Sequence, residues 1–181
     1  MHIHPILIRH ISNLTDARYF AAMQADWISI SLTHDATSFS IWHSLRDWVE
    51  GLQFAAELPV DDESLLAKTI IEASPDGLIF PTFPTIEIPT DQQVFVTTIQ
   101  PIPEGFRGLP IRILPYHAGQ ELTNTGGSEL IFLEANWNTD MLRLLLNTGY
   151  TGGICFSGSH EDAVGIKDFS LLDDLIALLR D

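Results

Sequence analysis

Residues 5–32, PILIRHISNLTDARYFAAMQADWISISL, decide the fold. Residues 6–8 form an apolar run and residues 27–32 are mostly apolar, as expected for strands buried on both faces of a parallel sheet. Between them, apolar side chains recur at helical spacing. Asn13 can cap that helix, and Asp16 suits the positive end of its dipole. A helix between two such strands makes them parallel, with a right-handed crossover.

The rest of the chain repeats this unit. Further strands are predicted at residues 52–58, 77–80, 94–99, 111–114, 129–133 and 153–157. Further helices are predicted at residues 41–50, from residue 61 or 62, and at residues 140–147 and 171–179. Ser38 or Ser40 is the expected cap of the first of these helices, and Ser170 that of the last. Eight buried strands alternating with about five helices predict a single small (β/α)8 TIM barrel over residues 1–181, with an open parallel sheet as the alternative.

The middle of the chain lacks clear helices. Seven prolines fall in residues 81–115, and the connections at residues 82–92, 100–110 and 118–128 show no convincing helical period. We therefore expect helices to be reduced or missing after strands four to six. Apolar barrel surface left uncovered there would suit a homodimer.

Composition limits the partners. The formal charge is −15, and the nine Lys and Arg residues do not cluster, which argues against nucleic acid and an anionic membrane surface. No apolar run approaches the roughly 20 residues of a membrane span, and the N-terminus lacks the apolar segment of a signal peptide, so a cytoplasmic protein is expected. Cys155 is the only cysteine, which excludes a disulfide framework; mid-strand, it is expected to be a buried small hydrophobe.

Both ends of the chain carry a resemblance to a known family. The matching positions are Ile8, Ile11, Ser12, Asn13, Leu14, Asp16, Ala17, Ala25 and Asp26 near the start, and Leu133, Asn138, Gly153, Ser157, Glu161, Gly165, Lys167 and Asp168 toward the end. In this order the residues resemble the motifs of phosphoribosylanthranilate isomerase, the (βα)8-barrel enzyme of tryptophan biosynthesis. The resemblance implies the same fold and an active site at the carboxyl ends of the strands.

The positions that carry the family's chemistry differ. Arg9 replaces the Cys that the family uses as general base, and arginine stays protonated. His10 replaces the following Gly, and residues 113–116 hold no carboxylate where the family has its general acid. Three phosphate-binding glycines fall on Ala135, Asn136 and Ser159, and residues 33–40 lack the family's substrate-binding Arg. The chain is therefore expected to be a divergent barrel that no longer catalyses this isomerisation. It would serve as a binding or interaction protein or have another role, with a small molecule at the barrel mouth as the candidate ligand and with no cofactor.

Two alternatives assign other chemistry to the strand ends. In the first, the chain is an active isomerase in which His10 or His117 acts as the base and Glu134 or Glu57 as the acid, since histidine titrates near neutrality. In the second, a divalent metal is bound where strand-end histidines and glutamates converge, namely His10, His34, His117, His160, Glu57 and Glu134. The candidate ligand-binding residues are Arg9, Glu57, Ser157, Ser159 and Lys167. Arg9 is alternatively expected to pair with Glu57 or Glu134 in a structural ion pair.

Overall fold

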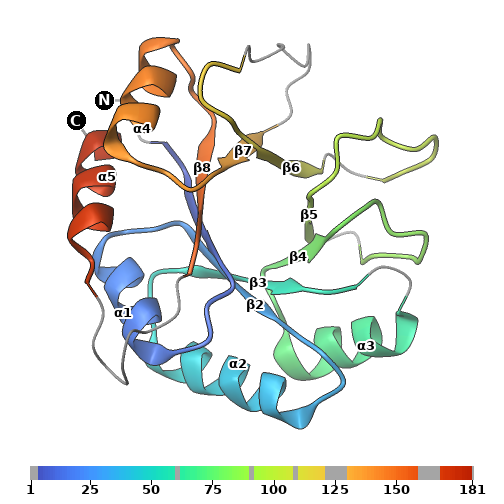
Figure 1. Ribbon diagram of the computed structural model, residues 1–181. Coiled ribbons are helices and arrows are strands. Elements are labelled where there is room, and N and C mark those ends of the chain that lie inside the picture. The colour runs from blue at the N-terminus through green and yellow to red at the C-terminus, as the bar shows by residue number, and fades with distance from the viewer. Residues whose placement is uncertain are drawn as a thin grey trace.

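Eight parallel strands close into a barrel in the computed structural model, which describes residues 4–59, 62–89, 92–107, 110–120, 130–158 and 168–180 (Figure 1). Neighbouring strands follow the chain order, and β8 pairs with β1. The strands are β1 Ile6–Arg9, β2 Trp27–Ser31, β3 Gln53–Glu57, β4 Gly77–Phe80, β5 Gln93–Val96, β6 Ile111–Pro115, β7 Ile131–Glu134 and β8 Gly153–Ser157. This confirms the TIM barrel and excludes the open sheet.

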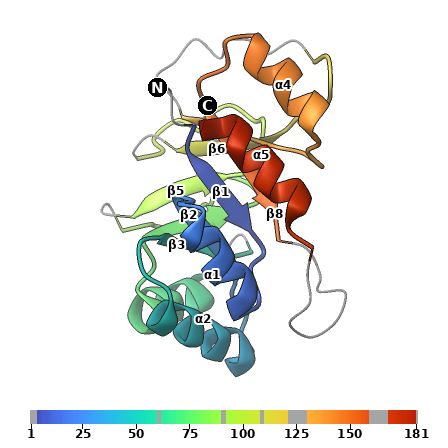
Figure 2. The ribbon, with the colours of Figure 1, turned by 90° about the vertical axis from the view of Figure 1, so that its left-hand side faces the viewer.

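Helices cover the barrel unevenly. They are α1 Leu14–Ala22, α2 Ala36–Trp48, α3 Glu63–Lys68 with a π-helical turn η1 at Thr69–Ala73, α4 Thr139–Asn147 and α5 Ser170–Arg180. Helices α1 and α5 lie where β1 and β8 meet (Figure 2). In the described residues that follow β4, β5 and β6, no helix forms and irregular loops take its place. None of the helices within the described ranges is long and apolar enough to cross a membrane.

One layer of the barrel interior is packed with aromatic rings. Side chains alternate between the interior and the helices along each strand. The ring centroids of Trp27 and Phe95 lie 4.9 Å apart, and those of Phe95 and Phe132 lie 6.2 Å apart. Gly153 makes room for this layer, because a Cβ there would lie 2.4 Å from Cδ1 of Phe132. Gly77 does the same beside Phe95 and Trp27, where a Cβ would meet ring carbons at 3.0 Å.

The helix-free side of the barrel is covered by its own loops. Arg112 lies between Ile111 and Ile113, which face the interior, so its side chain points outward. Its guanidinium is buried and donates hydrogen bonds to the carbonyl oxygens of Thr98 and Gln100, both at 2.8 Å. The outward-facing side chains of β4 and β5 are buried too: these are Leu78, Phe80, Val94 and Val96. The expectation of uncovered apolar surface is therefore wrong for β4 and β5.

Some element boundaries differ from the sequence predictions. Helix α2 starts at Ala36, because Asp35 accepts a hydrogen bond from the N–H of Thr37; neither Ser38 nor Ser40 is the cap. Asp168 accepts from the N–H of Ser170, so Ser170 is the first helical residue of α5 rather than its cap. The strand predicted at residues 94–99 is shorter in the structure, where β5 runs from Gln93 to Val96.

Candidate functional site

A network of charged and hydroxyl side chains closes the carboxyl end of the barrel. Arg9, at the last position of β1, is bound to two carboxylates. Its Nε and Nη2 donate to Oε1 and Oε2 of Glu57 at 3.1 and 2.8 Å, and its Nη1 donates to Oε2 of Glu134 at 2.9 Å. Ser157 donates to Oε1 of Glu134 at 3.3 Å. The network therefore joins the ends of β1, β3, β7 and β8.

Glu57 has more polar contacts than the other carboxylate of this network. Besides the two hydrogen bonds from Arg9, it accepts one from the hydroxyl of Ser29 on β2. The Nδ1 atom of His10 lies 3.3 Å from its Oε2. A carboxylate offers about four lone-pair sites, and these four contacts occupy them. Burial favours the protonated acid, but Arg9, Ser29 and His10 outweigh it and hold the pKa of Glu57 below its ordinary value.

The same charges act on the other members of the network. Burial alone would lower the pKa of the Arg9 guanidinium, but Glu57 and Glu134 raise it further above its ordinary value, so Arg9 stays charged. Cys155 lies fully buried next to this charged layer. Burial and the neighbouring Glu134 raise the pKa of its thiol well above the usual range, which makes it an unreactive thiol.

His10 has an unusual backbone conformation. Its φ angle is +59°, a left-handed value that is uncommon for residues other than glycine. The other two non-glycine residues with positive φ in the described chain, Gln24 and Ser74, follow the ends of helices, where this conformation is common. His10 instead follows a strand. The turn brings the imidazole back over the barrel mouth to Glu57, with about half of the side chain exposed.

The predicted site residues divide into three groups. Direct contacts at the barrel mouth join five of them: Arg9, His10, Glu57, Glu134 and Ser157. His117 is exposed in the turn after β6, where its N–H donates to Oε1 of Gln120 at 3.3 Å; within the described residues no contact joins it to the network. Ser159 and Lys167 lie outside the described residues. The predicted ion pair of Arg9 is confirmed, because Arg9 is paired with both Glu57 and Glu134.

Sequence analysis missed Ser29. Its side chain is fully buried in the middle of β2, yet its hydroxyl orients Glu57. A serine inside an otherwise apolar strand was the available signal, because a buried hydroxyl needs a hydrogen-bond partner. The partner could be named only once the barrel register placed β2 beside β3.

The end of β6 holds no acid. Pro115 is the last residue of the strand, and Tyr116 after it is buried and stacked on Trp137 with ring centroids 5.4 Å apart. Trp137 in turn donates from Nε1 to the carbonyl oxygen of Cys155 at 2.9 Å. These aromatic rings pack against each other at the mouth, and neither side chain carries a carboxyl group.

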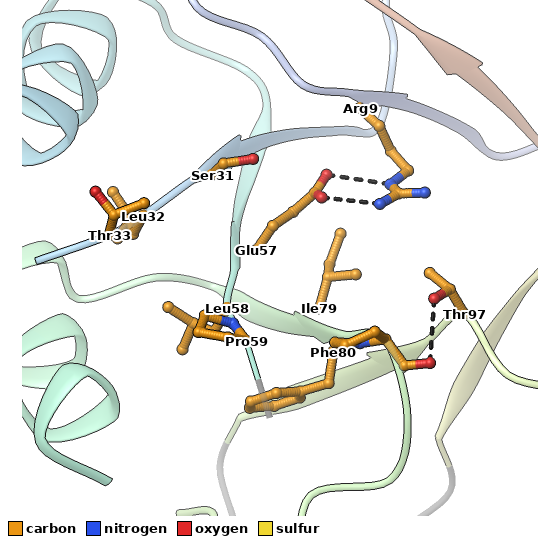
Figure 3. A pocket seen from close by; sticks show the side chains of 11 residues that line it. Arg9, Ser31, Leu32, Thr33, Glu57, Leu58, Pro59, Ile79, Phe80 and Thr97 are labelled. Carbon is orange, nitrogen blue, oxygen red and sulfur yellow. Dashed lines mark hydrogen bonds and ion pairs between the residues drawn. The ribbon is translucent and has the colours of Figure 1, made fainter. Parts of the chain in front are cut away.

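A pocket of about 360 Å³ opens beside the network, over the ends of β2 to β5 (Figure 3). Ser31 and Glu57 are paired neighbours on β2 and β3, and both line it together with Arg9. The full lining consists of Arg9, Ser31, Leu32, Thr33, Glu57, Leu58, Pro59, Ile79, Phe80, Pro81 and Thr97. This is a volume suited to a small molecule.

No metal site forms among the residues that the structure describes. Within them, no group of three or more His, Cys, Asp and Glu side chains is placed to hold an ion. At the mouth, the guanidinium of Arg9 takes the position between the two carboxylates that a cation would need. His160, another histidine of the metal hypothesis, lies outside the described residues.

The closed barrel with its polar mouth defines a (βα)8-barrel protein. No protein-family model and no curated protein sequence matches the chain. Solved structures do match over nearly the whole chain. A monomeric form of the dimeric phosphoribosylanthranilate isomerase from Thermotoga maritima has a TM-score of 0.71 at 12% identity, covering 98% of both chains.

Two further isomerase structures are similar. The enzyme from Thermus thermophilus has a TM-score of 0.68 at 13% identity, covering 97% of this chain and 98% of that one. The enzyme from Pyrococcus furiosus has a TM-score of 0.67 at 11% identity, covering 98% of both. The chain thus has the fold of the phosphoribosylanthranilate isomerases, and the resemblance found in the sequence is confirmed at the level of the fold.

Proposed function

We propose that this chain is a small-molecule-binding barrel that does not catalyse isomerisation of phosphoribosylanthranilate. One observation carries the proposal: Arg9, at the position that the resemblance gives to the general base, is a charged guanidinium held by three hydrogen bonds. It cannot accept a proton near neutral pH. Proton-transfer groups contribute about 100- to 10,000-fold each to a rate, so losing the base and the acid together removes most of the catalysis.

The test is the loss of phosphoribosylanthranilate in the presence of purified protein, with an active isomerase as positive control. We expect no turnover above the uncatalysed background. Robust turnover would refute the proposal. A thermal-shift measurement on the same sample shows that an inactive preparation is folded.

One contact favours a second candidate, an isomerase with substituted catalytic groups. His10 lies against Glu57, and a carboxylate that binds Nδ1 leaves Nε2 as a candidate base. Glu57 is a poor acid in this scheme, because its lowered pKa keeps it ionised, which leaves Glu134 as the acid of this hypothesis. This candidate predicts turnover that His10→Ala abolishes. Turnover unchanged in both His10→Ala and His117→Ala would remove it.

The location of the protein stays a prediction. A cytoplasmic protein is proposed from the composition, in which the single cysteine leaves no disulfide framework. Fractionation of cells that express a tagged chain measures it directly.

A further inference from the structure

The pocket over β2 to β5 has an apolar body and a polar edge. Ile79 and Phe80 of β4 and Leu58 after β3 supply apolar surface. The polar edge consists of the Arg9–Glu57 pair with Ser31 beside it, and two further hydroxyl groups, those of Thr33 and Thr97, lie on opposite sides of the pocket (Figure 3). A ligand that fits both parts has an apolar portion and a hydrogen-bonding end.

The two charged groups at this edge, Arg9 and Glu57, form a bidentate ion pair with each other. Three of the five N–H groups of Arg9 donate to Glu57 and Glu134. An anionic ligand would find only two further N–H groups of Arg9 and would bind beside Glu57, in a protein of formal charge −15. A cationic ligand would find the lone pairs of Glu57 occupied by Arg9, Ser29 and His10.

The hydroxyl groups, in contrast, keep hydrogen-bonding capacity. Figure 3 shows the oxygen of Ser31 directed toward the Arg9–Glu57 pair, and no hydrogen bond of this hydroxyl forms among the residues described. Thr97 donates to the carbonyl oxygen of Pro81 at 3.3 Å and can still accept. Thr33 accepts from the N–H of Asp35 at 3.2 Å and can still donate. Together they offer donors and acceptors without net charge.

We infer that the pocket takes an uncharged small molecule with an apolar body and one end that both donates and accepts hydrogen bonds, such as an amide or an alcohol. The inference rests on the proposed binding function and names its ligand class. Charge selects the ligand: in the pocket lining, the guanidinium of Arg9 and the carboxylate of Glu57 are paired with each other, so neither meets a charged ligand as an unpaired counter-ion.

The experiment compares three probes that share one ring: benzamide, benzoate and benzylamine. Binding to the full chain is measured by ligand-observed NMR and by titration calorimetry. We expect benzamide to bind, and benzoate and benzylamine to bind at least about tenfold more weakly, since a charged end would lose its hydration without meeting an unpaired counter-ion. Equal or tighter binding of benzoate or benzylamine, or no binding of benzamide, overturns the inference.

Two variants test whether benzamide binds in this pocket. Ser31→Ala and Thr97→Val each remove one hydroxyl and should weaken benzamide by about 3- to 10-fold. Ser44→Ala is the matched control, because the Ser44 hydroxyl bonds to the carbonyl of Ser40 on the exposed surface of α2. Unchanged affinity in both pocket variants would show that benzamide binds elsewhere. The isomerase assay is independent of these results, so turnover of phosphoribosylanthranilate would refute the proposed function without deciding the ligand class.

Discussion

Glu57 is the residue on which the barrel mouth depends. It receives contacts from β1 and β2, and through Arg9 it is joined to Glu134 on β7. Buried ion pairs are costly to form but destabilise strongly when one partner alone is removed. The network therefore specifies the arrangement of the strand ends, and single substitutions in it have large effects.

Replacing Arg9 by methionine removes the cation and keeps most of the side-chain volume. Two largely buried carboxylates then lose their shared cation, so we expect the free energy of unfolding to fall by about 3 kcal/mol. Urea denaturation monitored by tryptophan fluorescence measures it. The matched control is Arg46→Met, which removes a more exposed pair with Asp76 and should cost less than about 1 kcal/mol. Equal losses in both variants would contradict the structural importance of the network.

The lowered pKa of Glu57 predicts a pH-dependent contribution to stability. The folded state holds the carboxylate more strongly than the unfolded chain, whose glutamates titrate near 4.5. The contribution is thus fully present above that pH and is lost as the pH falls through the lower folded pKa. We expect Glu57→Gln to destabilise the protein at pH 7, with a gap to the unmodified protein that narrows below about pH 4.5. A gap that stays constant down to pH 3 would contradict this assignment.

At the scale of elements, the barrel consists of two unlike halves. Strands β1 to β3, β7 and β8 are each followed by a helix, while the loops after β4 and β5 pack on those strands in place of one (Figure 1). On the outer side of these strands, the guanidinium of Arg112 lies over the ring of Phe83, 5.5 Å from its centroid. This contact joins β6 to the loop after β4. The pocket opens beside the loop-covered half, where loop sequence can vary without altering a helix interface.

Gly153 sets the spacing between β8 and the aromatic layer of the interior. In Gly153→Ala, the new methyl group would lie 2.4 Å from Phe132, so we expect a loss of about 1–3 kcal/mol. Gly77→Ala should cost less, since its closest contacts would be at 3.0 Å. Thermal unfolding ranks the two variants. The double variant Gly153→Ala/Phe132→Leu should lose less than the sum of its parts, and strict additivity would show that the methyl group does not meet this ring.

Regular elements were predictable from local pattern. β4 and β8 have the predicted bounds, because each combines an apolar run with a glycine at its start. The start of α2 was not predicted, because the residues around the buried Phe39 in its first turn are small and mostly polar and show no helical spacing of apolar side chains. Arg9, Glu57 and Glu134 could be brought together in prediction, since all three end strands of one barrel. The left-handed turn at His10 could not be predicted, because no glycine signals it.

At the scale of the whole molecule, the oligomeric state stays open to measurement. A homodimer through the helix-free side remains a prediction, although the loops bury the outward side chains of β4 and β5. Ile99, in the loop after β5, is 81% exposed and would lie in such an interface. Sedimentation velocity should show a dimer that Ile99→Glu converts to a monomer. A monomer at all concentrations would contradict the prediction.

The closure of β8 onto β1 has a consequence for synthesis on the ribosome. Ile6 and Ile154 are register partners, so the barrel cannot close until the last strand has left the exit tunnel. Until then, β1 and β7 are the unpaired edges of a nascent sheet, and such edges recruit other chains. A chaperone that shields these edges during translation would raise the yield of folded protein, and a truncation before β8 should aggregate.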